Sequence, residues 1–232
     1  MTPAETVKGP RETFWSGLDL AARETLARGG RSRRYRKGDH LCLQGEPSEQ
    51  VIILERGWTK VCVGDSEGRE RVIAVRGPGE LLGETGLITD SPRMATVTAL
   101  HALSALVVPR QRFRAFLSDH PDAWKTVYKI LSLRLTESDE RILSLGSHVG
   151  AGRLALFVLR LAEQSGLPDP EGGIVLPPLS QTELGSCVDV SRETVARAMR
   201  AWREQDLIRN SWRRTVLLDP EGLRRHAKQF MI

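Results

Sequence analysis

Two arginines and a glutamate near the end of the 232-residue chain have the types and spacing needed to read DNA bases. Arg192 and Glu193 follow Ser191 directly, and Arg197 comes four positions after Glu193. On a helix that begins at Arg192, all three lie toward the N-terminal end, where arginine can pair with guanine O6 and N7 and glutamate can accept from cytosine N4. Phosphates repel an acid, so Glu193 favours base reading over simple charge attraction. The alternative is that Glu193 only stabilises the helix N-terminus and that the arginines are solvated.

Two short helices must position these side chains. Ser180 and Glu183 have the capping-box spacing at the start of the first helix, and Ser191 marks the start of the second. The connection between the two helices has the length of a helix-turn-helix turn, and the stretch from Leu207 to Leu218 predicts a β-hairpin, the usual wing. We expect contacts to DNA phosphates, which orient a protein without reading sequence, from Gln181, Thr182, Ser191, Thr194 and Arg200.

A second candidate site lies in the segment GELLGETGLITDSPRMATV. Gly83 and Glu84 precede a short apolar stretch that predicts one helical turn, and Arg93 follows before a strand. Amide groups at a helix N-terminus and one guanidinium together make an anion site, and a nearby carboxylate can accept from a sugar hydroxyl. The spacing of Gly77, Gly79 and Gly83 misses the dinucleotide-binding fingerprint, and ordinary turns are the alternative.

The N-terminal half has the pattern of an antiparallel β-sandwich. After a short helical stretch from Asp19 to Ala27, glycines separate short runs of β-forming residues. Strands about 8 to 12 residues apart with turn residues between them are typical of a sandwich or barrel. The runs are Val51 to Leu54, Trp58 to Val63, Arg71 to Val75, Ala95 to Leu100 and Leu103 to Val108.

A long helix should follow, with Pro121 in its first turn and Leu145 at its end. Its apolar positions recur every three or four residues, beside charged residues such as Arg134 and Arg141, which is typical of a dimerisation seam. A core helix packed on its own domain is the alternative. Ser138 is the one polar residue in the stripe, and we expect it to bind something rather than only to fix register. The stripe consists of Trp124, Val127, Leu131, Leu135, Ser138, Ile142 and Leu145.

Three glycines, Gly146, Gly150 and Gly152, predict a hinge after the long helix. A helix from Arg153 to Glu163 and a loop from Gly166 to Gly173 should come next. The expected fold class is α+β. We predict a β-sandwich sensor domain over residues 1–109, a long dimerisation helix over 110–146 and a winged helix-turn-helix over 147–232.

Composition excludes several classes of protein. Hydrophobic residues at 40% and charged residues at 27% are typical of a folded globular chain, and the net charge of +5 is compatible with a nucleic-acid partner. No apolar run of about 18 residues and no signal peptide occur, so we expect a cytoplasmic protein and no membrane partner. The spacing of Cys42, Cys62 and Cys187 favours reduced thiols over disulfides or a zinc site. No catalytic or metal-ligand pattern stands out, so we expect neither an enzyme nor a metal.

The chain from about Phe14 to Leu218 resembles the Crp/Fnr family of bacterial transcription regulators. The resemblance rests on the order of the parts and on the strings KGDHLCLQGEPSEQVIILERG, GE…SPRMATV and, most specifically, SRETVARAMR. It implies a jelly-roll sandwich of the cyclic-nucleotide-binding type, a homodimer and a palindromic DNA operator. It also implies a contact with RNA polymerase through the basic run Arg31 to Arg36, otherwise a solvated face, or through the loop Gly166 to Gly173.

The same resemblance implies residues for a cyclic nucleotide, either cyclic AMP or cyclic GMP. Glu84 corresponds to the residue that binds the ribose 2′-hydroxyl, and Arg93 to the one that binds the phosphate. The next residue is usually Ser or Thr in nucleotide-binding members but is Met94 here, which predicts weak binding. Ser138 and Asp139 match two adjacent hydroxyl residues that touch the base, one from each subunit, and only the first keeps its hydroxyl. The predicted site consists of Gly83, Glu84, Thr85, Arg93, Met94, Ser138 and Asp139.

Other functions stay open at this point. A regulator of the same fold could act without a nucleotide or with another ligand. A cyclic-nucleotide-binding subunit of an enzyme is disfavoured by the string SRETVARAMR. An iron–sulfur sensor would need a group of cysteines near the N-terminus, which the chain lacks. A haem sensor would need ligands such as His40, Cys42, Cys62 or His101, but a lone histidine is usually structural, and we expect no haem.

Overall fold

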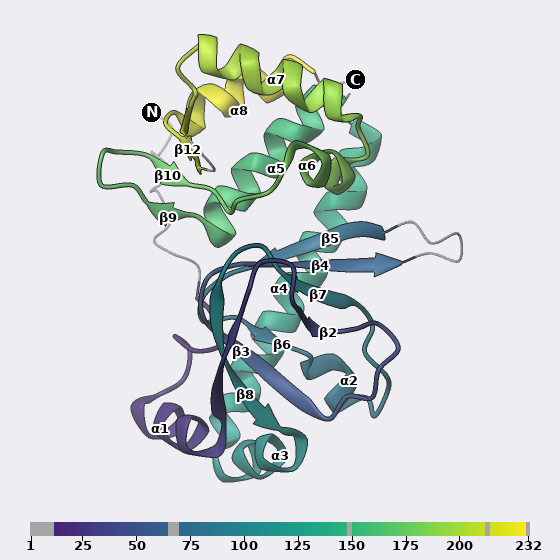
Figure 1. The fold of residues 1–232 in the computed structure, drawn as a ribbon, viewed down its shortest axis with the longest axis vertical. Helices are drawn as coiled ribbons and strands as arrows, with labels where there is room; N and C mark the ends of the chain where they lie inside the picture. The colour runs from purple at the N-terminus through teal and green to yellow at the C-terminus, as the bar shows by residue number, and fades with distance from the viewer. Residues whose placement is uncertain (1–11, 65–69, 148–149, 212–213, 231–232) are drawn as a thin grey trace, which may run out of the picture.

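The fold has a β-rich N-terminal half and a mainly helical C-terminal half, connected by one long helix (Figure 1). The computed structural model describes residues 12–64, 70–147, 150–211 and 214–230. In Figure 1 the long helix, α4 (Pro121–Ser147), runs behind the sheets toward the helical half above them. The predicted α+β class is confirmed.

Two four-stranded sheets form the predicted antiparallel sandwich. The first has the strand order β1-β8-β3-β6, and the second has the order β2-β7-β4-β5. All neighbours pair antiparallel, with Ile52 opposite Val107 in the first sheet and Lys60 opposite Thr98 in the second. The first sheet consists of β1 (Arg31–Tyr35), β8 (Leu103–Pro109), β3 (Gln50–Arg56) and β6 (Leu81–Leu82), and the second of β2 (His40–Cys42), β7 (Thr96–Ala99), β4 (Thr59–Gly64) and β5 (Glu70–Arg76).

Strand β3 is buried on both faces and so contributes side chains to two hydrophobic cores. Successive side chains of a strand point to opposite faces. Ile52 and Leu54 belong to the core between the two sheets, and Val51 and Ile53 belong to a second core under the helices. The helices that supply side chains to this second core are α1 (Leu20–Gly29), α2 (Glu84–Ile88), α3 (Arg110–Asp119) and α4.

Helix α4 places one face on the sensor half and leaves another face in solvent. It begins at Pro121, the residue predicted for its first turn, while α3 precedes it as a separate helix within 110–146. Val127 is buried in the core of its own half, which corrects its assignment to the seam, because it cannot meet a partner. Three other apolar side chains stand out at seven-residue spacing with exposed fractions of 65%, 64% and 64%, and these are Tyr128, Leu135 and Ile142.

The other predicted seam positions differ in how exposed their side chains are. Trp124 and Leu131 are half-buried and pack against the core of the N-terminal half. Ser138 is exposed. The side chain of Leu145 lies outside the described residues. The exposed face is therefore narrower at the start of α4 than the sequence predicts.

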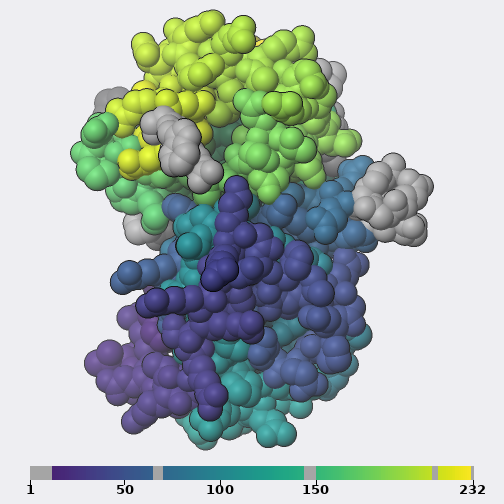
Figure 2. All heavy atoms as spheres, viewed as in Figure 1, coloured from purple at the N-terminus to yellow at the C-terminus, as the bar shows by residue number. Residues whose placement is uncertain are grey.

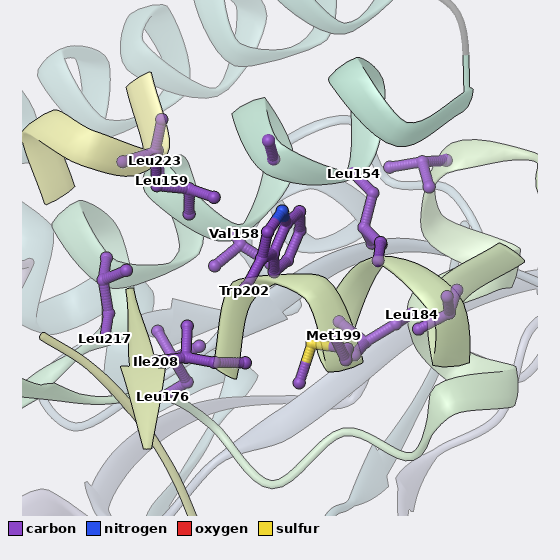
Figure 3. Packing of buried hydrophobic residues seen from close by; sticks show 14 of the residues in the cluster. Leu154, Val158, Leu159, Leu176, Leu184, Met199, Trp202, Ile208, Leu217 and Leu223 are labelled. Carbon is purple, nitrogen blue, oxygen red and sulfur yellow. The ribbon is translucent and has the colours of Figure 1, made fainter. Parts of the chain in front are cut away.

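The C-terminal half is built around Trp202, which is 0% exposed. Figure 3 shows the side chains gathered near it, among them Leu154 and Val158 from α5, Met199 from α7 and Leu217 from β12. The helices are α5 (Gly150–Ser165), α6 (Gln181–Val188), α7 (Arg192–Glu204) and α8 (Pro220–Lys228). The predicted helix-turn-helix is formed by α6 and α7.

A small sheet with the order β11-β12-β10-β9 completes this half. Strands β11 (Ile208–Ser211) and β12 (Arg214–Leu217) pair antiparallel as the predicted wing, and residues 212–213 lie outside the described residues. The predicted loop from Gly166 to Gly173 contains the two-residue strand β9 (Leu167–Pro168), which pairs with β10 (Ile174–Val175).

Helix α4 ends and α5 begins within the predicted hinge, and its three glycines lie in the adjoining ends of these helices. Gly146 belongs to α4, whereas Gly150 and Gly152 belong to α5, and Gly152 is buried. A Cβ at position 150 would lie 2.9 Å from Cγ1 of Val190, so close packing on the turn before α7 favours glycine there. Residues 148–149 of the predicted hinge lie outside the described part of the chain.

Candidate functional site

The predicted anion site lies where strand β6 turns into helix α2 (Glu84–Ile88). Gly83 is the N-cap of α2 and has a φ of 80°, a conformation that favours glycine. A Cβ at this position would also collide with Nη1 of Arg93, which lies across the turn. Both the backbone conformation and the arginine therefore require glycine here.

Arg93 is buried, and its guanidinium is held by backbone oxygens. Its Nη2 donates to the carbonyl of Gln50 at 2.5 Å, and its Nη1 donates to the carbonyl of Gly83 at 3.1 Å. A guanidinium carries five N–H groups, so these two bonds leave donors for an anion. The cation is thus held in place by neutral groups that do not cancel its charge.

Glu84 is the buried acid beside this cation, with a side chain only 4% exposed. Its Oε1 pairs with Nη1 of Arg134 on α4 at 2.5 Å and accepts a hydrogen bond from the hydroxyl of Thr85 at 3.1 Å. Its Oε2 is buried without a hydrogen-bond partner among the described residues. A buried polar atom without a partner costs free energy, so a hydroxyl donor placed against Oε2 would be stabilising.

Arg134 is a site residue, although the sequence pattern places it only on the charged side of the long helix. Its Nη2 donates to the carbonyl of Leu81 at 2.6 Å, so it ties α4 to both β6 and Glu84. Burial disfavours the charged form of Arg134, but the charges of Glu84, Glu80 and Glu137 and the hydrogen bond to Glu84 together outweigh it, and the pKa of Arg134 lies above its ordinary value. The signal available in the sequence was a cation one helical turn before Ser138.

The remaining predicted ligand residues are not gathered at the site within one chain. Met94 is 66% exposed. Ser138 and Asp139 are exposed on α4 about 6 Å beyond Arg134 along the helix axis, and no hydrogen bond or ion pair joins either side chain to the described residues around Gly83. The side chains that the structure does bring together around Gly83 are those of Glu84, Thr85, Arg93 and Arg134.

The second predicted site is held by well-formed helix caps. The hydroxyl of Ser180 accepts from the backbone N–H of Glu183 at 3.2 Å, and the carboxylate of Glu183 accepts from the N–H of Ser180 at 2.8 Å, which completes the predicted capping box. At the next helix, the hydroxyl of Ser191 accepts from the N–H of Thr194 at 3.2 Å. These bonds fix the start of α6 and of α7.

One face of α7 is buried and the other is open to solvent. Val195, Ala198, Met199 and Trp202 are buried, at the spacing of an amphipathic helix. The predicted base-reading residues Arg192, Glu193 and Arg197 are exposed, as are the predicted phosphate contacts Thr182, Ser191 and Arg200, whereas Gln181 and Thr194 are half-buried. The position of these side chains leaves them accessible to DNA.

Glu193 combines the two roles considered for it. Hydrogen bonds from its own backbone N–H and from the hydroxyl of Ser191 hold the pKa of this carboxyl below its ordinary value. In the free protein Glu193 therefore stabilises the N-terminus of α7. Because Glu193 is exposed, it can release those hydrogen bonds and accept a hydrogen bond from a DNA base instead.

Metal and thiol chemistry have no assembled site among the described residues. No group of three His, Cys, Asp or Glu side chains there could hold a metal ion. Cys42, Cys62 and Cys187 are free and buried, and burial raises the pKa of Cys187 to about 12. Within the same described ranges, no helix is long and apolar enough to cross a membrane.

Comparisons with known proteins identify both halves. Residues 32–120 match the family described as cyclic nucleotide-binding domain, and residues 152–226 match the Crp-like helix-turn-helix domain. The chain is 25% identical over 218 residues to a CRP-like cAMP-activated global transcriptional regulator of Mycobacterium tuberculosis, covering 94% of this chain and 97% of the relative. It is 29% identical over 177 residues to the cAMP-activated global transcriptional regulator CRP of Salmonella typhimurium, covering 75% and 83% of the two chains.

A solved structure has a similar fold. The c-di-GMP responsive global regulator CLP of Xanthomonas campestris superposes with a TM-score of 0.68 at 22% identity, covering 87% of this chain and 100% of the other. This chain has a cyclic-nucleotide-binding sandwich, a long helix and a helix-turn-helix in that order, and its fold is similar to that of the solved regulator. The relatives are transcription regulators and not enzymes. The chain belongs to the Crp/Fnr family of DNA-binding transcription regulators.

Proposed function

We propose that this regulator is a homodimer that binds a palindromic operator in response to cyclic AMP or cyclic GMP. The observation that carries the nucleotide part is the buried Oε2 of Glu84, which has no donor among the described residues, together with the buried cation of Arg93 close to it. A ribose 2′-hydroxyl would supply the missing donor, and the cyclic phosphate would take the remaining N–H groups of Arg93. Arg134 would keep the carboxylate in place.

The dimer is supported by the exposed stripe on α4. Tyr128, Leu135 and Ile142 repeat every seven residues, which is the spacing of a helix that packs along a second helix. Ser138 and Asp139 lie on the same stretch of helix. In a dimer, we expect Ser138 and the partner subunit's Asp139 to complete the nucleotide site at the base.

The operator should have two-fold symmetry, since the dimer presents two copies of α7. Arg192, Glu193 and Arg197 would read each half-site, and by family resemblance the half-sites would be similar to GTGA, about one helical turn apart. The nucleotide would act by favouring one arrangement of the two α7 helices. It can shift that equilibrium only as far as its affinities for the two arrangements differ.

RNA polymerase is proposed as a second partner, through strand β1. This strand is at the edge of its sheet, and Arg31, Arg33 and Arg34 are exposed on it. None of the three forms an ion pair within the described part of the chain, and a row of unpaired cations fits an acidic protein surface. The turn between β9 and β10 is the alternative contact.

Titration calorimetry on the full-length chain tests the nucleotide assignment. Wild type, Arg93→Gln and Met94→Ser would each be titrated with cyclic AMP, cyclic GMP and c-di-GMP. We expect weak binding of cyclic AMP or cyclic GMP to wild type and loss of binding in Arg93→Gln. We expect binding to Met94→Ser to be tighter by ~1.5 to 3 kcal/mol, because serine adds a donor to a charged phosphate.

Two results would contradict the proposal. Heat equal to buffer for all three proteins would favour a regulator that works without a nucleotide. Binding of c-di-GMP alone would give this chain the ligand class named for the Xanthomonas campestris regulator.

A further inference from the structure

The DNA-reading half is packed directly onto the sensor half. Figure 2 shows the green and yellow atoms of the C-terminal half meeting the blue and purple atoms of the N-terminal half along a broad boundary. Cys62 of β4 and Val72 of β5 are buried in the same cluster as Leu184 and Cys187 of α6. One hydrophobic core therefore continues from the second sheet into the helix-turn-helix.

Polar contacts close the edges of this core. The indole Nε1 of Trp58, just before β4, donates to the carbonyl of Ser165 at the end of α5 at 2.7 Å. The backbone N–H of Val72 on β5 donates to the hydroxyl of Ser186 on α6 at 3.3 Å. Because β5 is at the edge of its sheet, this N–H would otherwise have no strand to pair with.

The shorter and more buried of two ion pairs between the second sheet and α6 with its caps, among the described residues, joins Lys60 on β4 to Glu183 on α6. Their Nζ and Oε1 atoms are 2.8 Å apart, and the side chains are only 21% and 23% exposed. Glu183 is also the residue that closes the capping box at the start of α6 with its other oxygen, Oε2. One carboxylate thus joins the sensor sheet to the first turn of the helix-turn-helix.

The charges of this pair stabilise each other despite partial burial. Burial disfavours the charged form of Lys60, but the hydrogen bond and charge of Glu183 outweigh it, and the pKa of Lys60 lies above its ordinary value. Burial likewise disfavours the charged form of Glu183, but hydrogen bonds from Lys60 and Ser180 outweigh it, and the pKa of Glu183 is lowered.

We propose that Lys60 is a positioning residue for DNA recognition, which holds α6, and through it α7, in a DNA-competent orientation on the sensor sheet. The docked arrangement does not mask the reading face, because Arg192, Glu193 and Arg197 are exposed in it. Lys60 also neutralises the acid in the first turn of α6, the end that we expect to face phosphates. This role of Lys60 rests on the proposed operator recognition, to which a residue of the sensor half would then contribute.

A double-mutant cycle on the full-length chain tests the role of this pair. Lys60→Met removes the ion pair from the sensor side. Glu183→Gln removes it from the α6 side and leaves an amide that can still close the capping box. The matched control is Arg71→Gln, which removes a mostly exposed ion pair across the same boundary, between Arg71 on β5 and Asp189, the C-cap of α6, 3.8 Å apart.

Fluorescence anisotropy would give the affinity for a GTGA palindrome and for scrambled DNA, without nucleotide and with cyclic AMP or cyclic GMP. We expect each single variant to lower the ratio of specific to scrambled affinity about five- to tenfold, and the double variant to lower it no further, because both singles break one contact. Arg71→Gln should leave the ratio unchanged.

Thiol labelling reports on docking independently of DNA. Cys62 and Cys187 lie in the core shared by the two halves, whereas Cys42 lies in the core between the two sheets of the sandwich. Iodoacetamide followed by mass spectrometry should label Cys62 and Cys187 faster in Lys60→Met than in wild type, and should label Cys42 at the same rate in both.

Two results would overturn the positioning role. Faster labelling with an unchanged affinity ratio would make the contact purely structural. An equal loss of specific and scrambled affinity would make Lys60 a phosphate contact. If wild type itself fails to prefer the palindrome, the proposed operator recognition is wrong, and the labelling result still decides whether Lys60 holds the two halves together.

Discussion

The ion pair between Glu84 and Arg134 should be the most costly single contact to break in the sensor half. It links two segments 50 residues apart in sequence, with the carboxylate side chain 4% exposed and the guanidinium 18% exposed. Arg134→Met keeps much of the side-chain volume but removes the charge and the hydrogen bond to the carbonyl of Leu81. The carboxylate of Glu84 would then be a buried charge without its cation.

The expected loss of folding stability follows from the burial of both side chains. Removing one partner of a buried ion pair costs about 3 to 5 kcal/mol, because the other charge stays buried without compensation. Most domains have a free energy of unfolding of roughly 5 to 15 kcal/mol, so the loss is a large fraction of the total. Urea unfolding followed by tryptophan fluorescence would measure it. The double variant Glu84→Gln and Arg134→Met should recover part of the loss, since no buried charge remains.

Lys125→Met is the matched control on the same helix. Lys125 pairs with Asp122, and these side chains are 84% and 87% exposed, so solvent screens their attraction and we expect no measurable change. If Arg134→Met destabilises the protein no more than Lys125→Met does, the role given to this buried pair is wrong.

Three further predictions follow from the other sites. Arg197→Ala should lower discrimination between the palindrome and scrambled DNA by ~1 to 3 kcal/mol in anisotropy titrations, and an equal loss on both DNAs would mean a phosphate contact. Leu135→Asp should convert the dimer into monomers in light scattering, because the seam would bury an unpaired charge, and a monomeric wild type would refute the seam. The pair of Lys60 and Glu183 should stabilise folding between the ordinary pKa values of 4.5 and 10.5. The lowered pKa of Glu183 means that its contribution is lost as pH falls through that lowered value, and the raised pKa of Lys60 means that its contribution is lost as pH rises through that raised value. The difference in unfolding free energy between wild type and Lys60→Met should therefore shrink in acid, and a difference independent of pH would contradict this.

Features set by a few neighbouring residues could be predicted from the sequence. Ser180 and Ser191 cap α6 and α7 as their spacing indicates, and Pro121 begins α4. Strand β3 was evident from its continuous apolar run, because both of its faces are buried. In each case the signal and the contact that it implies lie within a few residues.

Features that depend on distant partners were missed. The sequence of strand β1 indicates a basic run and not a strand. Four of its five residues are exposed at a sheet edge, so polar and apolar residues do not alternate along it. The role of Arg134 depends on Glu84, which is far away in sequence, and the burial of Val127 depends on a sheet that folds beneath α4. The docking of β4 and β5 on α6 likewise has no local signature.

The most direct test of the central claim is the affinity of the full-length chain for a labelled GTGA palindrome, measured by fluorescence anisotropy with and without cyclic AMP or cyclic GMP, in wild type and in Arg93→Gln. We predict that one of these nucleotides raises the affinity of wild type for the palindrome much more than for scrambled DNA. We predict no such increase in Arg93→Gln, which has lost the cation of the site. Wild-type affinity that is the same with and without either nucleotide, or that is equal for palindromic and scrambled DNA, would contradict the account.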